Sequence, residues 1–192
     1  MNRVGPVDQV ILLELSRQVL HAAIDLSIPE KQLWDHFRSS HLGGAPIFRQ
    51  PGCVFVTLRK QGQLRGCVGK VGQPEPLGEA TTENCFAAAL RDPRFDPVKP
   101  PELADVQVEL TLLGPLQPMP SPDRLIIGRH GILVTQGYSR GLLLPQVAEE
   151  LGLEPTQFLS LGCKKAGLRE NAWRRDARVE IFPAQHFGSW SQ

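Results

Sequence analysis

A cysteine flanked by glycines is the most unusual feature of this 192-residue sequence. Cys67 lies in the run Leu64-Arg65-Gly66-Cys67-Val68-Gly69. Glycine weakens strand pairing and lets a backbone or a ligand come close, so Gly66 and Gly69 are candidate substrate-contacting positions. Arg65 beside the thiol could lower its pKa, and the thiolate is the reactive form of cysteine. The run therefore predicts either a reactive Cys67 or a small buried cysteine at a β-bulge.

Two further residues complete a candidate catalytic set with Cys67. His130, between Arg129 and Gly131, is a candidate base, because histidine titrates near neutral pH and can accept a thiol proton. Glu109 lies on the polar side of a predicted strand, where it could orient the histidine, transfer protons or bind a metal. A loop histidine and a solvated glutamate are the alternatives. The sequence does not show whether His130 reaches Cys67.

Arginines near the cysteine and after a predicted helix are candidate anion-binding residues. Arg65 lies close to Cys67, while Arg91 and Arg94 flank Asp92-Pro93. Planar guanidinium groups bind carboxylates and phosphates through paired hydrogen bonds. We therefore expect Arg65 or Arg94 to hold a small anionic ligand, unless Asp92 and Arg94 only tie down a loop.

The other residues that often bind metals or cofactors are scattered along the chain. The cysteines have neither paired nor C-x-x-C spacing, and the histidines form no H-E-x-x-H pattern: Cys53, Cys67, Cys85, Cys163, His21, His36, His41, His130 and His186. Such spacing favours free thiols over disulfides or a zinc site. The sequence also lacks Walker A, G-x-G-x-x-G and G-x-S-x-G patterns. We expect neither a metal nor a cofactor.

A basic segment around Trp173 raises the question of nucleic-acid binding. Its positive residues are Lys164, Lys165, Arg169, Arg174 and Arg175. Such a segment with an aromatic residue suits RNA binding. However, Glu170 and Asp176 lie beside it, and the whole chain carries 21 Lys and Arg against 20 Asp and Glu, a formal net charge of +1. A solvated face is therefore expected, and a nucleic-acid partner is not.

The chain also lacks membrane and export signals. Its apolar runs, such as residues 10–13 and 132–134, fall far short of the ~20 residues that a membrane span needs. The N-terminus has no basic stretch followed by an apolar one, as a signal peptide would have. We expect a soluble, cytoplasmic protein without a membrane partner.

The predicted elements that would position these residues mix helices and hairpins without βαβ regularity. The first predicted helix has Asp8 as N-cap and an apolar stripe that ends at Leu26. Further helices are predicted after Pro29, at 77–90, from Pro145 and after Pro155. Hairpins are predicted at residues 53–71 and 124–144, with strands at 106–112 and 178–182. The fold class is therefore α+β, with mainly antiparallel sheets flanked by helices.

The chain is expected to form a single domain over residues 1–192. No internal repeat or low-complexity tract divides it. The proline-rich stretch at residues 115–122 is a candidate connection between two lobes, with a long surface loop as the alternative.

The order of the motifs resembles the AMMECR family, whose prokaryotic members are called AmmeMemoRadiSam system protein A. The matching motifs are Phe55-Val56-Thr57-Leu58, Leu64-Arg65-Gly66-Cys67-Val68-Gly69, Ala87-Ala88-Ala89 with Asp92-Pro93-Arg94-Phe95, Pro97-Val98 with Glu102-Leu103, Gly128-Arg129-His130-Gly131-Ile132, Leu144-Pro145-Gln146-Val147-Ala148, and Lys165-Ala166-Gly167-Leu168 with Trp173. Val68 stands where the family usually has isoleucine. Cys85 stands where a small residue is usual, and we expect it in the core.

The resemblance implies two unequal α+β lobes with a cleft between them, and Cys67 close to that cleft. It brings no established reaction. Family members are similar in their genomic company, beside Memo-like and radical-SAM proteins, which implies a shared modification pathway with these partners. Two hypotheses follow: a cysteine-dependent cleft enzyme using Cys67, His130 and Glu109, or a non-catalytic adaptor or RNA-binding regulatory module.

Overall fold

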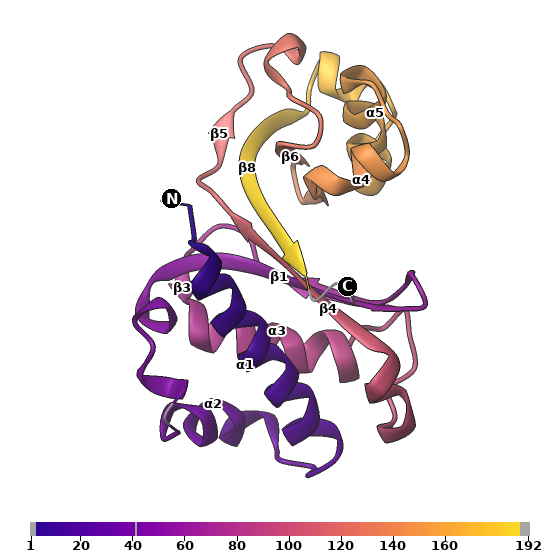
Figure 1. Ribbon diagram of the computed structural model, residues 1–192. Helices are drawn as coiled ribbons and strands as arrows, with labels where there is room; N and C mark the ends of the chain where they lie inside the picture. The colour runs from indigo at the N-terminus through magenta and orange to yellow at the C-terminus, as the bar shows by residue number, and fades with distance from the viewer. Residues whose placement is uncertain (1–2, 41, 189–192) are drawn as a thin grey trace. The chain divides into compact units, whose positions relative to one another are not determined.

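The computed structural model describes residues 3–40 and 42–188, arranged as two compact units (Figure 1). Unit 1, the larger, runs to Leu113 and takes up the chain again at His186, and unit 2 is Gly114–Gln185. Each unit combines antiparallel strands with helices, which confirms the predicted α+β class. In the described residues, no helix is both long enough and apolar enough to cross a bilayer. The cleft expected between the lobes stays a prediction.

Unit 1 is a small antiparallel sheet with three α-helices. Its elements are α1 (Pro6–Ile24), α2 (Glu30–Arg38), η1 (Leu42–Gly44), η2 (Pro46–Arg49), β1 (Pro51–Lys60), β2 (Gln63–Gly69), β3 (Glu75–Pro76), α3 (Leu77–Leu90), η3 (Pro100–Asp105) and β4 (Val106–Leu113). Strand β1 pairs antiparallel with β2, β3 and β4, and the last residues of β8 (Arg178–Gly188) follow β4. The predicted hairpin of β1 and β2, the helix at 77–90 and the strand from Val106 are confirmed.

The start of α1 differs from the prediction. Asp8 is not its N-cap, because the helix begins two residues earlier at Pro6, with Gly5 in the N-cap position. Proline suits the first helical position, since its missing N–H has no partner there in any case. The helix also ends at Ile24, so Leu26, predicted on the apolar stripe, is 67% exposed.

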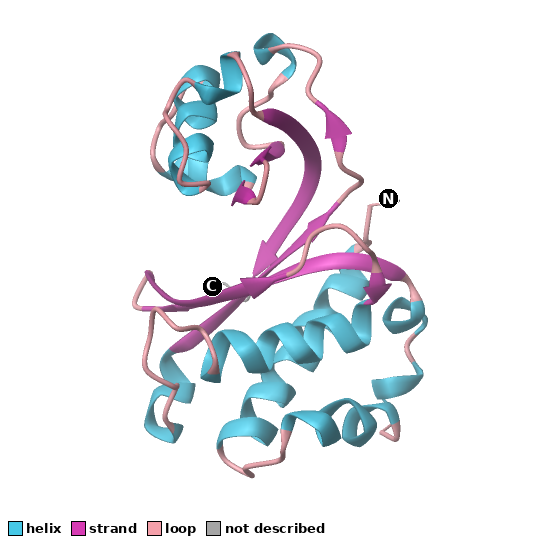
Figure 2. Ribbon diagram, turned by 180° about the vertical axis from the view of Figure 1, so that it is seen from behind, coloured by secondary structure: helices cyan, strands magenta, loops and turns pink. Residues whose placement is uncertain are grey.

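Helices α1 and α3 pack on one face of the sheet of unit 1 (Figures 1 and 2). Alternate strand residues point to opposite faces, and the even-numbered ones on β1 and β4 lie in the helix-covered core: Val54, Val56, Leu58, Val108, Leu110 and Leu112. The odd-numbered residues of both strands therefore point to the other face. That face carries Thr57 and Glu109.

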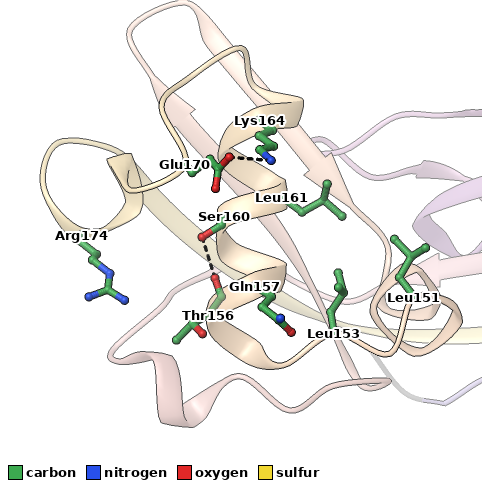
Figure 3. Close-up of a pocket in the computed structure, with 9 residues that line it drawn as sticks. All are labelled: Leu151, Leu153, Thr156, Gln157, Ser160, Leu161, Lys164, Glu170 and Arg174. Carbon is green, nitrogen blue, oxygen red and sulfur yellow. Dashed lines mark hydrogen bonds and ion pairs between the residues drawn. The ribbon is translucent and has the colours of Figure 1, made fainter.

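Unit 2 combines antiparallel strands with helices around a core of its own. Its elements are β5 (Gln117–Pro118), η4 (Pro122–Arg124), β6 (His130–Gln136), β7 (Ser139–Leu143), α4 (Pro145–Glu150), α5 (Pro155–Lys165), η5 (Ala172–Arg174) and most of β8. The strand order is β5-β8-β6-β7. Ile132, Val134 and Phe158 belong to its core, and α5 packs on β6 and β7. The other side of α5 carries Thr156, Gln157, Ser160, Leu161 and Lys164 (Figure 3).

Two glycines form turns at the ends of elements in unit 2. Gly137 has a φ of 57° between β6 and β7, and Gly167 has a φ of 73° just after α5. Both values lie in the left-handed region that glycine adopts without strain. Strand β6 begins only at His130, later than the predicted start at residue 124, because η4 and a turn occupy the residues before it. Strand β8 begins at Arg178 as predicted and continues to Gly188.

Candidate functional site

Three polar side chains form a row across the helix-free face of the unit 1 sheet. Cys67 on β2 lies opposite Thr57 on β1, and Thr57 lies opposite Glu109 on β4. Residues directly opposite one another on neighbouring strands project from the same face. We call Cys67, Thr57 and Glu109 the polar row. It unites two residues that the sequence analysis singled out with one that it did not.

Hydrogen bonds connect the row to its surroundings but, among the residues that the structure describes, leave one buried oxygen without a hydrogen-bond partner. The Thr57 hydroxyl donates to Cys67 Sγ at 3.3 Å, and Arg59 Nε donates to Glu109 Oε1 at 2.8 Å. Within the described residues, Glu109 Oε2 has no hydrogen-bond partner, although Glu109 is only 2% exposed. A buried acceptor left unpaired costs free energy, so it marks a position where a ligand can donate a hydrogen bond.

Glu109 is buried, which excludes the alternative of a solvated glutamate. The alternation along β4 indicated a half-buried strand, yet Glu109 and Thr111 are both buried on the second face. Arg59 lies against the carboxylate there. Alternating polar residues show that a strand has two different faces, but not that the polar face meets water.

The histidine beside Glu109 is His186. Its Nε2 lies 3.9 Å from Glu109 Oε2, and its Nδ1 lies 3.1 Å from the hydroxyl oxygen of Thr111. The sequence analysis placed His130 in this role. His130 belongs to unit 2, where its Nδ1 accepts a hydrogen bond from the Ile126 N–H, and burial lowers its pKa. A catalytic role for His130 stays a prediction.

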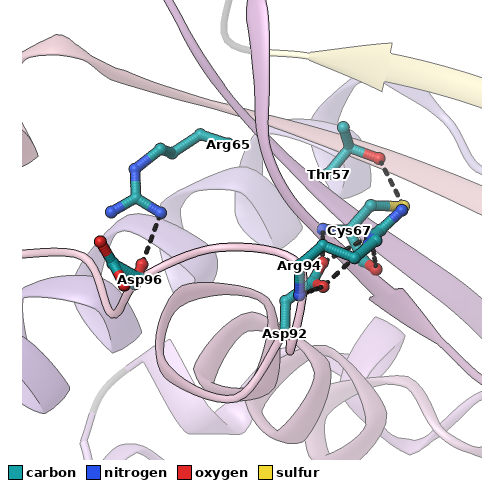
Figure 4. A network of polar contacts seen from close by, with 6 residues as sticks. All are labelled: Thr57, Arg65, Cys67, Asp92, Arg94 and Asp96. Atoms are coloured by element: carbon teal, nitrogen blue, oxygen red, sulfur yellow. Dashed lines mark hydrogen bonds and ion pairs between the residues drawn. The ribbon is translucent and has the colours of Figure 1, made fainter.

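An ion pair of side chains caps the edge of β2 at Cys67. The Cys67 N–H donates to Asp92 Oδ2 at 2.8 Å, and the Cys67 carbonyl accepts a hydrogen bond from Arg94 Nη2 at 3.0 Å (Figure 4). Asp92 and Arg94 also pair with each other, through Arg94 Nε at 2.8 Å and Nη2 at 2.5 Å. The pair thus supplies the contacts that a further strand would give to this edge.

The guanidinium of Arg65 binds acidic and carbonyl groups away from the thiol. It donates to both Glu102 carboxylate oxygens, at 3.2 and 3.1 Å. It also donates to the Asp96 carbonyl at 2.8 Å (Figure 4). Arg91, the third candidate, pairs with Glu30. Anion binding by Arg65 or Arg94 stays a prediction, while both guanidinium groups already hold internal carboxylates.

Burial raises the pKa of the Cys67 thiol above its ordinary value. The Thr57 hydroxyl and the positive charge of Arg94 favour the thiolate and lower the pKa. Desolvation, with a smaller contribution from the negative charge of Asp92, raises the pKa by more than these two contacts lower it. The prediction that Arg65 lowers the thiol pKa is therefore wrong. Neighbours in a strand sequence are not the nearest neighbours in space, and Arg94 takes the expected place of Arg65.

The glycines beside Cys67 have close structural neighbours. A Cβ atom at Gly66 would collide with the backbone carbonyl oxygen of Ala88 on α3, and one at Gly69 would collide with the Phe55 ring. The close approach expected from these glycines is thus made by a helix backbone and by an aromatic ring. Substrate contact by Gly66 or Gly69 stays a prediction.

The other thiols lie apart from the row. Cys85 and Cys163 are buried in the cores of units 1 and 2, which confirms the expectation for Cys85. Cys53 is half-buried, and all four cysteines are free thiols. His41 lies outside the described residues. In the ranges 3–40 and 42–188, no three His, Cys, Asp or Glu side chains are grouped as metal ligands.

The sequence profile of the AMMECR1 family matches residues 13–187. The chain belongs to the AMMECR1 family. An AMMECR1 relative from Thermofilum pendens is 42% identical, over 97% of this chain and 92% of its own length. Another, from Methanosarcina barkeri, is 42% identical, over 74% of this chain and 73% of its own.

A crystal structure supports the same fold. The uncharacterised protein PH0010 from Pyrococcus horikoshii has a TM-score of 0.81 and 32% sequence identity, covering 92% of this chain and 89% of that one. The names of these AMMECR1 relatives state no reaction, so the function has to be argued from the site itself.

Proposed function

We propose that the protein is a cysteine-dependent enzyme that transfers a group through Cys67, with the polar row as its substrate-binding surface. One observation carries the proposal: Cys67, Thr57 and Glu109 stand side by side on three strands, and a buried Glu109 oxygen lacks a hydrogen-bond partner among the described residues. A buried polar atom without a hydrogen-bond partner costs free energy, which a ligand that donates to it would offset.

Each residue of the row has its own role in the proposed reaction. Glu109 Oε2 accepts a hydrogen bond from an N–H or O–H of the substrate, and His186 beside it serves in proton transfer. Cys67 is the nucleophile, and the Thr57 hydroxyl donates to its sulfur. Burial raises the pKa of the Cys67 thiol, so its proton has to leave during the reaction.

The proposed step is a simple displacement at an electrophilic carbon. Cys67 Sγ forms a bond to that carbon as its bond to the leaving group breaks, and the thiol proton ends on the leaving group. An acceptor nucleophile then forms a bond to the same carbon as the bond to Cys67 Sγ breaks, and the proton of the acceptor returns to the sulfur. Neither displacement needs an oxidant or a reductant. The modification pathway implied by the family resemblance, with Memo-like and radical-SAM proteins as partners, is the setting that we propose for this step.

Acyl donors of small size test the proposal. Wild-type protein is incubated with a p-nitrophenyl ester, and mass spectrometry measures the adduct on each cysteine. We expect Cys67 to be acylated faster than Cys53, the other half-buried thiol, and we expect urea to abolish that preference. Glu109→Gln, which keeps the size of the side chain, should slow the acylation of Cys67 and leave Cys53 unchanged.

Glu109→Gln also removes the ion pair with Arg59, so its effect on folding has to be separated from its effect on the reaction. Two variants of Thr57 test the row with that ion pair intact. Thr57→Val removes the hydroxyl that faces the thiol, and Thr57→Ser keeps it. Slower acylation in the valine variant with recovery in the serine variant would support the row as a site. Equal adducts on Cys67 and Cys53 in the folded protein would refute it.

A further inference from the structure

A groove on unit 2, unrelated to the polar row, lies on the outer side of α5. Its volume is about 380 Å³, and its apolar lining consists of Leu151, Leu153 and Leu161. Leu151 is 59% exposed, so a segment bound in the groove would remove its apolar surface from water. In Figure 3, these leucines lie on one side of α5 and Arg174 extends on the other. The groove therefore joins an apolar end to a basic end.

Positive charge at the basic end is not neutralised within the described part of the chain. Lys164 pairs with Glu170 at 2.7 Å, whereas Arg174 lies over the Trp173 ring, 4.5 Å from its centre, and makes no ion pair there. An exposed guanidinium held against an aromatic ring is oriented to receive a carboxylate.

We propose that this groove docks a short acidic and apolar segment of a partner protein. Apolar side chains of the segment would bury Leu151 and Leu153, while its carboxylates would meet Arg174. Mixed apolar and charged contacts of this kind are typical of peptide-binding grooves. Single-stranded RNA fits less well, because it stacks on open aromatic faces, and Arg174 covers a face of Trp173.

Synthetic peptides test the proposal on the full chain. A fluorescein-labelled peptide of leucine and glutamate is compared with a leucine and lysine peptide and with a serine and glutamate peptide, by fluorescence anisotropy. We expect only the first to bind, and its affinity to fall as salt rises. A uridine oligonucleotide is titrated under the same conditions.

Matched exposed variants assign the binding to the groove. Leu151→Ser and Arg174→Glu should each weaken the leucine and glutamate peptide by about tenfold. Leu26→Ser, which alters an equally exposed leucine in unit 1, and Arg175→Glu, which alters the next arginine, should leave it unchanged. Equal binding of all three peptides, equal effects of the four variants, or tighter binding of the oligonucleotide would overturn the proposal.

Discussion

The carboxylate of Asp92 accepts a hydrogen bond from the backbone N–H of Cys67, at 2.8 Å. This contact joins the loop after α3 to the edge strand that carries the candidate nucleophile. Asp92 is 5% exposed and pairs with Arg94, so its charge is compensated where it is buried. This hydrogen bond therefore holds together the motifs around Cys67 and Asp92, which are separated in sequence.

Replacing this carboxylate should destabilise unit 1. Asp92→Asn keeps the shape of the side chain but loses the charge that binds Arg94 and the Cys67 N–H. We expect a loss of about 2 kcal/mol in the free energy of unfolding at pH 7. Urea unfolding measures it, with Asp35→Asn on the exposed surface as the matched control. Equal stabilities of the two variants would contradict a structural role for Asp92.

Acid should weaken the same region. The Arg94 guanidinium lowers the pKa of Asp92 to about 2, and the Arg65 guanidinium lowers the pKa of Glu102 to about 2. Both groups have higher pKa values in the unfolded chain, so the unfolded state binds more protons at acid pH. Their stabilisation is therefore complete above about pH 4.5 and is lost as pH falls through about 2.

Stability measured from pH 5 to pH 2 checks this dependence. Asp92→Asn should lose less stability over that range than the wild type, because one of the two titrating groups is gone. A variant curve that runs parallel to the wild-type curve would show that Asp92 does not titrate as its contacts require.

The arginine that affects the thiol should be Arg94. Arg94→Gln removes a positive charge that favours the thiolate and leaves Asp92, which opposes it, so the pKa of Cys67 should rise further. Arg65→Gln should not move it, because that guanidinium lies on Glu102 and Asp96. The pH dependence of iodoacetamide labelling measures the pKa of Cys67 in both variants. A shift in the Arg65 variant as large as in the Arg94 variant would be inconsistent with the structure.

Gly66 should tolerate no larger residue. A methyl group there meets the Ala88 carbonyl oxygen, and neither backbone can yield without moving α3 from β2. We expect Gly66→Ala to cost about 1–3 kcal/mol of unfolding free energy. Gly44→Ala, which meets no atom within 4 Å, should change it by less than about 0.5 kcal/mol. Thermal unfolding measures the stability of both variants. Equal stabilities would contradict the predicted collision at Gly66.

Local patterns predicted most of the fold. The helix over residues 77–90 could be read from its small and apolar residues and from the Asp92-Pro93 stop, and the hairpin of β1 and β2 from Gln61-Gly62. These features depend on residues close together in sequence. The start of α1 was missed because Asp8 satisfies the N-cap preference, while Pro6 satisfies a competing one.

The site was harder to predict because it depends on register. Cys67 and Glu109 were identified from residue type, but their alignment through Thr57 requires the pairing of three strands. One feature of the sequence could have pointed to Thr57: it is a polar residue between the apolar Val56 and Leu58, which are buried. No feature of the sequence pointed to His186, because only the path of the final strand brings it near Glu109.

The most direct test of the central claim, that the polar row acts as one site, is a double-mutant cycle of acylation rates at Cys67. The rates are measured for wild type, Thr57→Val, Glu109→Gln and the double variant, with Cys53 as the internal reference. We predict that each single change slows Cys67 and that the double variant is little slower than either, since both disrupt the same bound substrate. Rates at Cys67 that are unchanged by both substitutions would contradict the account.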